Sequence, residues 1–331
     1  MAKLGIIIAN TGSPSAASPE AVKSYLAEFL TDKHIMPMNP LMWKLLLNTV
    51  ILPARSKASA QKYASIWTEQ GSPLTVIMAS LAQKLEAALG KQGYDVRVVP
   101  AASYGSPSLG EALSTCVHAG CSEIVVVPLY PQSAFSTTKV VEDRAYAAWE
   151  SMQTTLLLPE APVSTTLHIT SAYSTNSCYL QALVHTIQAV GFGSEPHDKL
   201  LFAFHSVPLC NINEGDTYDA QVRETTHALA HMLDIAPSDW ALGFQCRFDR
   251  ARTWLSPFVS EAIENLKAQG PIGRLFVIAP NFSVDCLETL YDIDLELREE
   301  YKGDLIYIPC LNDSENQVAL LIDHLSDYLS D

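Results

Sequence analysis

The sequence has 331 residues, enough for one large domain or two medium ones, and 48% of them are apolar and 17% charged, as in an ordinary globular enzyme. Acidic residues outnumber basic ones by 36 to 21, which gives a formal net charge of −15. This balance excludes a nucleic-acid partner, because phosphate binding needs a basic face, and it argues against general adsorption to anionic membranes.

The first residues lead directly into a strand and a well-marked helix. The apolar run "LGIIIAN" is followed by "TGSP". No charged segment precedes a long apolar one, so no signal peptide is expected. Ser18 can cap a helix, Pro19 suits its first turn and Glu20 suits its positive end. A strand–loop–helix unit is therefore predicted at this end.

The segment "LMWKLLLNTVILP", residues 41–53, is strongly apolar but short and contains Lys44. A membrane-spanning helix needs about 20 apolar residues, so this segment does not cross a bilayer. Two interpretations stay open with equal weight. The segment is either a buried helix or an exposed apolar lip that meets a membrane or an apolar ligand.

Short apolar runs alternate with helical patterns along the whole chain, which indicates βα units and parallel sheets. The two halves also resemble each other. "LGIIIANTGSP" matches "LLFAFHSVP", and "EIVVVPLYPQSAFSTT" matches "RLFVIAPNFSVDCLETL". We therefore predict an α/β protein with two similar, Rossmann-like, doubly wound domains. The first domain covers 1–165 and the second 166–313, and a last helix over 314–331 packs back on the first.

The seven cysteines fit neither a disulfide framework nor a metal cluster. Their number is odd and no CxxC motif occurs, so reduced thiols in a cytoplasmic protein are expected. The usual nucleotide and esterase fingerprints, GxGxxG, GxxxxGK[ST] and GxSxG, are also absent. In open parallel sheets the ligand lies beyond the carboxyl ends of the strands, so the polar residues that follow each strand are the candidates for a site.

An acidic pattern runs through "DCLETLYDIDLELREE", residues 285–300. On a regular α-helix its carboxylates share an arc of roughly 80°. They are Asp285, Glu288, Asp292, Glu296 and Glu299. The row can simply be a solvated face, but it contains no basic residue, and oxygen ligands in a row suit a hard cation or a poorly hydrated divalent metal in transit.

His205 ends the apolar run "LLFAF" of the second half. A histidine in such a place can be a hydrogen-bonded core residue, or it can serve a site. If its strand neighbours the one that precedes Glu288, imidazole and carboxylate meet at one sheet edge. Such a pair can bind a divalent metal or remove protons from a substrate, and we favour this functional interpretation.

Several motifs in order then give the chain a specific resemblance. They include "SPEAVKSYLAEFLTD", "IWTEQGSPL", "VVVPLYPQSAFSTT", "LLFAFHSVP", "NEGDTYDAQV", "TWLSP" and "DCLETLYDID". Together they resemble the ferrochelatase family over nearly the whole chain. The resemblance implies the class II chelatase fold and a lyase of haem synthesis that inserts ferrous iron into a porphyrin.

The resemblance also implies roles for individual residues. His205 and Glu288 match the catalytic pair that shares metal binding and removal of the pyrrole protons. Asp292 and Glu296 match acids on a metal or proton path behind that pair. The matches to porphyrin contacts are Thr11, Arg55, Ser72, Tyr104, Tyr218 and Trp254.

The family implies porphyrin and ferrous iron as substrates and no permanent cofactor, and no iron–sulfur cluster is expected. It also matches residues 35–52 to a lip that meets the membrane in some members, so a cytoplasmic protein with peripheral membrane contact is one expectation. The sequence does not determine the oligomeric state.

Three positions depart from the family pattern, all on the porphyrin side. Ser103 stands where members commonly have arginine, Ser133 where many have tyrosine, and Thr11 where an apolar or aromatic residue is usual. The leading prediction is insertion of Fe²⁺ into protoporphyrin IX, since Thr11 is not the tyrosine of many coproporphyrin-using members. The alternatives are a coproporphyrin III ferrochelatase, a chelatase for another metal or tetrapyrrole, a non-catalytic porphyrin- or haem-binding paralogue, and an unrelated α/β binding protein.

Overall fold

The computed structural model of the chain describes residues 3–35, 40–155, 165–245, 247, 249 and 251–329. Its backbone forms two compact units. Unit 1 comprises Met1–Leu129, Phe135–Ser171 and His324–Asp331, and unit 2 comprises Tyr130–Ala134 and Ala172–Asp323.

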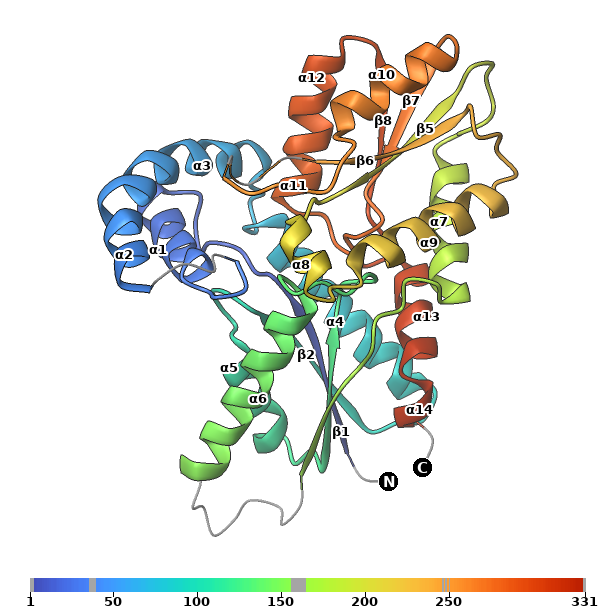
Figure 1. Ribbon diagram of the computed structural model, residues 1–331. Coiled ribbons are helices and arrows are strands. Elements are labelled where there is room, and N and C mark those ends of the chain that lie inside the picture. The colour runs from blue at the N-terminus through green and yellow to red at the C-terminus, as the bar shows by residue number, and fades with distance from the viewer. Residues whose placement is uncertain are drawn as a thin grey trace. The chain divides into compact units, whose positions relative to one another are not determined.

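Unit 1 contains a four-stranded parallel sheet in the order β2-β1-β3-β4. Its strands are β1 (Leu4–Asn10), β2 (Val96–Ala102), β3 (Glu123–Pro128) and β4 (Thr166–Ile169). Its helical elements are α1 (Pro19–Leu30), α2 (Pro40–Leu46), the π-helix η1 (Leu47–Ile51), α3 (Leu52–Ile66), α4 (Pro73–Lys91), α5 (Leu109–His118), α6 (Thr138–Thr155) and α14 (Ser326–Leu329). Figure 1 shows this sheet with α5 and α6 beside it.

Unit 2 repeats the same topology, with a parallel sheet in the order β6-β5-β7-β8. Its strands are β5 (Lys199–Phe204), β6 (Trp240–Phe244), β7 (Arg274–Ile278) and β8 (Asp304–Ile308). Its helical elements are α7 (Ser177–Ala189), α8 (Leu209–Asn213), α9 (Tyr218–Met232), α10 (Val259–Gln269), α11 (Leu287–Leu290), the π-helix η2 (Asp292–Leu297), α12 (Arg298–Tyr301) and α13 (Glu315–His324). The equivalent strand orders confirm the predicted fold class of two similar doubly wound α/β domains.

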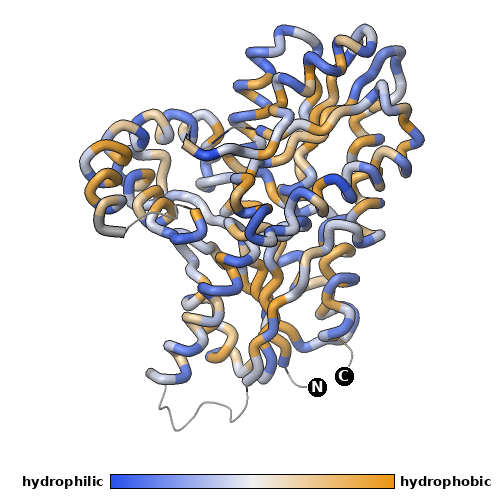
Figure 2. Tube along the Cα trace, viewed as in Figure 1, coloured by the Kyte–Doolittle hydropathy of each residue, from blue (hydrophilic) through white to orange (hydrophobic). Residues whose placement is uncertain are grey.

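The burial of β5 explains its apolar sequence. Phe202 and Phe204 pack on one face of the sheet with residues of α7, α9 and α13, whereas Leu201 and Ala203 pack on the other face with residues of α10 and η2. Both faces are thus covered, as is usual for parallel sheets, and the strand becomes a continuous hydrophobic run. Figure 2 shows the same hydrophobic colouring along the strands of both sheets.

Local capping signals place several helices where the sequence predicts them. Ser18 caps α1 by accepting a hydrogen bond from the Ala21 amide, and Ser108 caps α5 in a reciprocal capping box with Glu111. Helix α4 starts at Pro73 and ends at Lys91. The first and second βα units therefore follow from sequence alone.

The C-terminal region differs from the expected single helix over 314–331. It forms two helices, of which α13 lies largely in unit 2 and α14 in unit 1. The reason lies in α13 itself, because Leu320 joins the unit 2 core and Asp323 accepts a hydrogen bond of 2.9 Å from Asn176 at the start of α7.

The apolar segment 41–53 presents one buried and one exposed face. Trp43, Leu47 and Leu52 are buried, and the Trp43 ring nitrogen donates to the Leu30 carbonyl. The exposed apolar residues are Met42, Leu45, Leu46 and Val50, with Met42 72% and Leu45 69% exposed. Each of the two interpretations therefore holds for one face, because one face is buried and the other is an exposed apolar lip, here defined as these four residues. Within the described part of the chain no helix is long and apolar enough to cross a membrane.

Candidate functional site

His205 is the first residue after β5 and is partly buried. Its ring Nδ1 lies 2.8 Å from the carbonyl oxygen of Ser206. A carbonyl oxygen only accepts, so Nδ1 carries the proton of the neutral ring and Nε2 keeps its lone pair. The backbone therefore fixes the tautomer in which Nε2 can accept a proton or bind a metal ion.

The loop that carries His205 is held by a neighbouring segment, residues 253–255. Leu255 donates to the Val207 carbonyl over 3.0 Å and accepts from the Ser206 hydroxyl over 3.0 Å, and Leu209 donates to Thr253 over 2.9 Å. These paired segments place the predicted residue Trp254 opposite Pro208 in an antiparallel bridge. The imidazole thus projects from a backbone that is fixed on two sides.

Trp254 and Tyr218 are both buried around this loop. The Trp254 ring nitrogen donates to the Asp249 carbonyl over 3.1 Å, and the Arg252 guanidinium lies 4.9 Å from a ring centroid of the indole. The Tyr218 hydroxyl donates to the backbone carbonyl of His205 over 2.9 Å. Burial raises the pKa of Tyr218, which keeps its hydroxyl protonated as a donor. Tyr218 therefore holds the backbone of His205 in place.

Glu288 lies in the first turn of α11, which follows β7. Strand β7 is the hydrogen-bonded neighbour of β5, with Phe202 paired to Ile278. His205 thus directly follows β5, and Glu288 lies in the first helix after the adjacent parallel strand β7. Cys286 is the N-cap residue of α11. Burial raises the pKa of its thiol, and the charge of the neighbouring Glu288 raises it further, so the thiol stays neutral.

Asp285 does not belong to the acidic row that the sequence predicts. It precedes α11, is 5% exposed and accepts four hydrogen bonds. The donors are the Tyr307 hydroxyl, the Thr289 hydroxyl at 3.0 Å, the Asn312 amide at 2.6 Å and the Cys310 backbone at 3.4 Å. Its carboxylate joins the end of β8 to the first turn of α11, and so it holds the backbone on which Glu288 sits.

The expected regular helix over 285–300 is also interrupted by the π-helix η2. The Tyr291 carbonyl accepts from both Leu295 and Glu296, which marks the wider turn. A π turn contains more residues than an α turn, so each residue of η2 advances less around the helix axis than in an α-helix. The spacing of the carboxylates around the axis therefore differs from that of the predicted regular row. Asp292 and Glu296 both lie in η2 and are partly buried, whereas Glu299 is exposed. π turns of this kind occur frequently at functional sites.

In the described residues no group of three or more histidine, cysteine, aspartate or glutamate side chains could hold a metal ion. The four predicted metal-binding residues, His205, Glu288, Asp292 and Glu296, therefore do not form such a group in this structure.

The predicted porphyrin contacts of unit 1 occupy different environments. Thr11 is partly buried and follows β1, and its carbonyl accepts from the Tyr104 amide over 2.9 Å. Ser72 is buried and accepts from the Ser13 hydroxyl over 2.7 Å. Arg55 is exposed on α3. Tyr104 is only 1% exposed, so its ring offers a ligand little surface.

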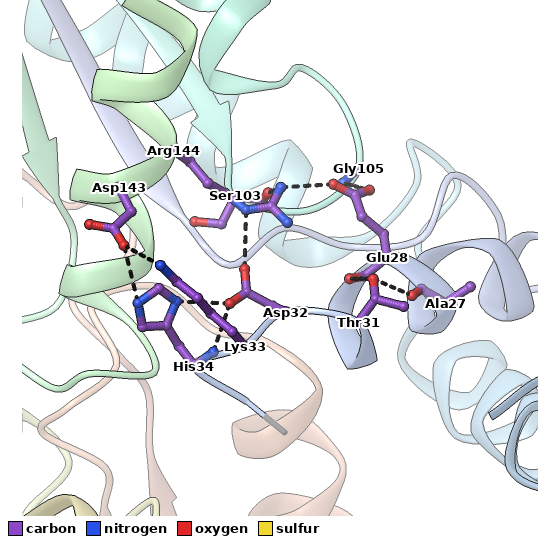
Figure 3. Close-up of polar contacts among 10 residues, drawn as sticks. All are labelled: Ala27, Glu28, Thr31, Asp32, Lys33, His34, Ser103, Gly105, Asp143 and Arg144. Atoms are coloured by element: carbon purple, nitrogen blue, oxygen red, sulfur yellow. Dashed lines mark hydrogen bonds and ion pairs between the residues drawn. The ribbon is translucent and has the colours of Figure 1, made fainter. Parts of the chain in front are cut away.

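A cluster of charged residues in unit 1, drawn in Figure 3, includes Arg144, which covers Tyr104, and the sequence did not predict it. The Arg144 guanidinium lies 4.3 Å from the centroid of the Tyr104 ring and donates to the Ser103 carbonyl. It also forms ion pairs with Glu28 at 2.9 Å and Asp32 at 3.4 Å. The partners are more than 100 residues apart in sequence, so no local motif could reveal them.

His34 completes this cluster from the turn after α1 (Figure 3). Its Nδ1 lies 2.8 Å from Asp32 and its Nε2 lies 3.2 Å from Asp143 of α6. Burial alone would raise the pKa of Asp32, but hydrogen bonds from the His34 backbone and ring and the charge of Arg144 hold that pKa below its usual value. A hollow of about 640 Å³ opens beside these residues. The cluster ties α1 to α6 within unit 1.

Comparison with known proteins identifies the family of this chain. The ferrochelatase family model matches residues 3–328. The ferrochelatase of Edwardsiella ictaluri is 40% identical over 324 residues, which are 96% of this chain and 96% of that relative. The chain belongs to the ferrochelatase family. Family membership makes it an enzyme of haem synthesis, a porphyrin iron chelatase of the lyase class.

Solved structures agree on the fold. SirB from Bacillus subtilis, solved with Fe³⁺, has a TM-score of 0.54 at 12% identity and covers 100% of this chain and 96% of its own. A multi-domain protein of Deinococcus radiodurans, described as structurally similar to chelatases, has a TM-score of 0.57 at 12% identity, and the chain covers 56% of its length. At this identity the likeness concerns the chelatase fold alone.

Proposed function

We propose that the chain inserts Fe²⁺ into protoporphyrin IX, which gives protohaem and releases two protons. The observation that carries this proposal is the 2.8 Å contact between His205 Nδ1 and the Ser206 carbonyl, which leaves Nε2 as an acceptor directly after the strand next to the one that leads to Glu288. An imidazole and a carboxylate at one sheet edge supply the base and the metal ligand that the reaction needs.

The reaction requires removal of two pyrrole protons and delivery of a dehydrated metal ion. In our proposal His205 Nε2 accepts one pyrrole proton and the Glu288 carboxylate accepts the other, and each group binds the metal ion only while it is unprotonated. Asp292 and Glu296 continue from Glu288 along η2 as a path for metal or protons. The neutral Cys286 thiol beside Glu288 adds no second charge there. Iron is the substrate, so the proposal includes no permanent cofactor and no iron–sulfur cluster.

The porphyrin contacts are proposed residue by residue from the family match. Arg55 and Ser72 offer a cation and a hydroxyl to the propionates, Thr11 faces the metal centre, and Trp254 offers an apolar wall. Tyr104 and Tyr218 are buried, so we assign them to positioning the loops that carry the contacts. We further propose a cytoplasmic enzyme whose apolar lip meets the membrane.

The proposal is tested by anaerobic assay of the purified chain with Fe²⁺ and either protoporphyrin IX or coproporphyrin III, followed by the shift of the Soret band. We expect many turnovers with protoporphyrin IX and a larger kcat/KM than with coproporphyrin III. A larger kcat/KM with coproporphyrin III contradicts the choice of substrate. Stoichiometric binding without turnover contradicts the enzymatic proposal and favours a porphyrin-binding paralogue.

A further inference from the structure

The carbonyl that orients the His205 ring belongs to Ser206, whose side chain anchors this part of the loop. The Ser206 hydroxyl donates to the Leu255 carbonyl over 3.0 Å, and the Leu255 amide donates to the Val207 carbonyl over 3.0 Å. Leu255 therefore binds the two residues after His205 with both of its backbone polar groups. One of these two hydrogen bonds requires a hydroxyl at position 206.

The anchoring hydrogen bond lies in the interior. Ser206 is 1% exposed and Leu255 is 4% exposed. On a surface, water takes the place of a lost donor, whereas in the interior the acceptor stays unsatisfied or the backbone shifts to find another partner. Loss of the Ser206 hydroxyl should therefore move the peptide unit that it holds, and this peptide unit carries the carbonyl that faces the imidazole.

The position of this carbonyl determines which ring nitrogen of His205 carries the proton. A neutral imidazole carries one proton, on either nitrogen, and the hydrogen bond made by one nitrogen decides the tautomer. The Ser206 carbonyl lies 2.8 Å from Nδ1 and accepts from it. If the carbonyl turns away, the proton is no longer held at Nδ1 and can move to Nε2, where it removes the lone pair that would accept a proton or bind a metal ion.

We propose that Ser206 is a positioning residue, whose hydroxyl holds His205 in the tautomer that keeps Nε2 unprotonated. Ser206 acts through its own backbone carbonyl and takes no proton itself. The catalytic use of Nε2 rests on the proposed function, whereas the tautomer is a property of the folded chain without substrate. Ser206 is therefore assigned an effect on the rate of metal insertion and none on porphyrin affinity.

The test compares Ser206→Ala, which removes the hydroxyl, with Ser206→Thr, which keeps it. Thr226→Val is the matched control, because the Thr226 hydroxyl is also buried and donates to a backbone carbonyl, that of Val222, over 2.8 Å within α9. The full chain is labelled with ¹⁵N in its histidines, and the His205 signals are identified by their loss in His205→Gln. At about pH 8, where free histidine is neutral, ¹⁵N NMR shows which ring nitrogen carries the proton.

The unsubstituted chain, Ser206→Thr and Thr226→Val should all show His205 protonated at Nδ1. Ser206→Ala should show the proton shared between both nitrogens. Its kcat for Zn²⁺ insertion into protoporphyrin IX should fall about three- to tenfold, the effect of one hydrogen bond, with KM for the porphyrin unchanged. A proton that stays on Nδ1 in Ser206→Ala overturns the proposal. An equal change of tautomer in Thr226→Val also overturns it, because general loosening of unit 2 would affect both variants alike.

The NMR measurement needs no turnover and so distinguishes this proposal from the proposed function. If the unsubstituted chain fails to metallate porphyrin, the proposed function fails, but a shift of the His205 proton in Ser206→Ala still supports Ser206 as the residue that holds the tautomer. If the chain metallates porphyrin and the proton stays on Nδ1 in Ser206→Ala, the proposed function stands and the role of Ser206 is overturned.

Discussion

The hydroxyl of Tyr218 donates a hydrogen bond of 2.9 Å to the backbone carbonyl of His205. On the other side of the same residue, the His205 ring is fixed by the Ser206 carbonyl. The imidazole is therefore oriented by two backbone contacts, one of which depends on a side chain in α9. This arrangement makes Tyr218 a positioning residue whose effect can be measured.

Tyr218→Phe removes the hydroxyl and leaves the His205 carbonyl without this donor. We expect a loss of about 1 kcal/mol in the free energy of unfolding and a fall in kcat of about three- to tenfold, because the imidazole is less well oriented. Denaturant unfolding and porphyrin metallation rates measure the two effects. Tyr301→Phe, in a helix without a proposed site residue, is the control. An unchanged kcat in Tyr218→Phe would mean that the hydroxyl has no part in orienting His205.

Asp285→Asn should destabilise unit 2 strongly. The buried carboxylate accepts four hydrogen bonds, and an amide can accept only at its oxygen and turns an NH₂ group toward donors. We expect a loss of about 2–4 kcal/mol in urea unfolding, together with lower activity because the turn that carries Glu288 loosens. Asp294→Asn, in a more exposed pair with Arg298, should cost less than about 1 kcal/mol. Equal losses in the two variants would be inconsistent with a holding role for Asp285.

Asp32 should make the stability of unit 1 depend on acid pH. Its pKa lies below the ordinary value of 3.8 in the folded chain, so its stabilising effect is complete above about pH 4 and is lost as the pH falls through the lower folded value. Asp32→Asn should lower the free energy of unfolding by about 1–2 kcal/mol at neutral pH. The difference from the unsubstituted chain should shrink toward about pH 2. A difference that stays constant over this range contradicts the assignment.

The apolar lip should bind lipid. Leu45 and Val50 are 69% and 55% exposed on α2 and η1, and α2 is hydrophobic in Figure 2. Co-sedimentation with phosphatidylcholine vesicles should detect binding of the unsubstituted chain. The double variant Leu45→Ser/Val50→Ser should reduce that binding by at least about tenfold, because about 1.5–3 kcal/mol of burial is lost at each site. Leu209→Ser in α8 should leave it unchanged. Absence of vesicle binding by the unsubstituted chain would exclude a lipid role for the lip.

The sequence predicts the strand ends better than it predicts what holds them. A run such as "LLFAF" is hydrophobic because both sheet faces are covered, and this pattern alone puts His205 at a strand end. The repeated pattern of the halves likewise predicts the two equivalent sheets. Both results depend on neighbouring residues or on a periodicity that can be read directly along the chain.

Features that depend on distant partners could not be predicted in this way. The assumption of a regular helix put Asp285 into the acidic row, but Tyr307 and Asn312 hold it in the loop before α11. The same assumption hid the π-helix η2, since hydrophobic spacing does not distinguish a wide turn from a regular one. Arg144 covers Tyr104 from 40 residues further along the chain, and nothing near either residue indicates the contact.

In the proposed function His205 and Glu288 form the catalytic pair. The most direct test is the initial rate of Zn²⁺ insertion into protoporphyrin IX by His205→Ala and Glu288→Gln, with porphyrin binding measured in parallel by fluorescence. We predict that each substitution lowers kcat by at least about a hundredfold while porphyrin affinity changes less than about threefold. Full activity in either variant would contradict the claim.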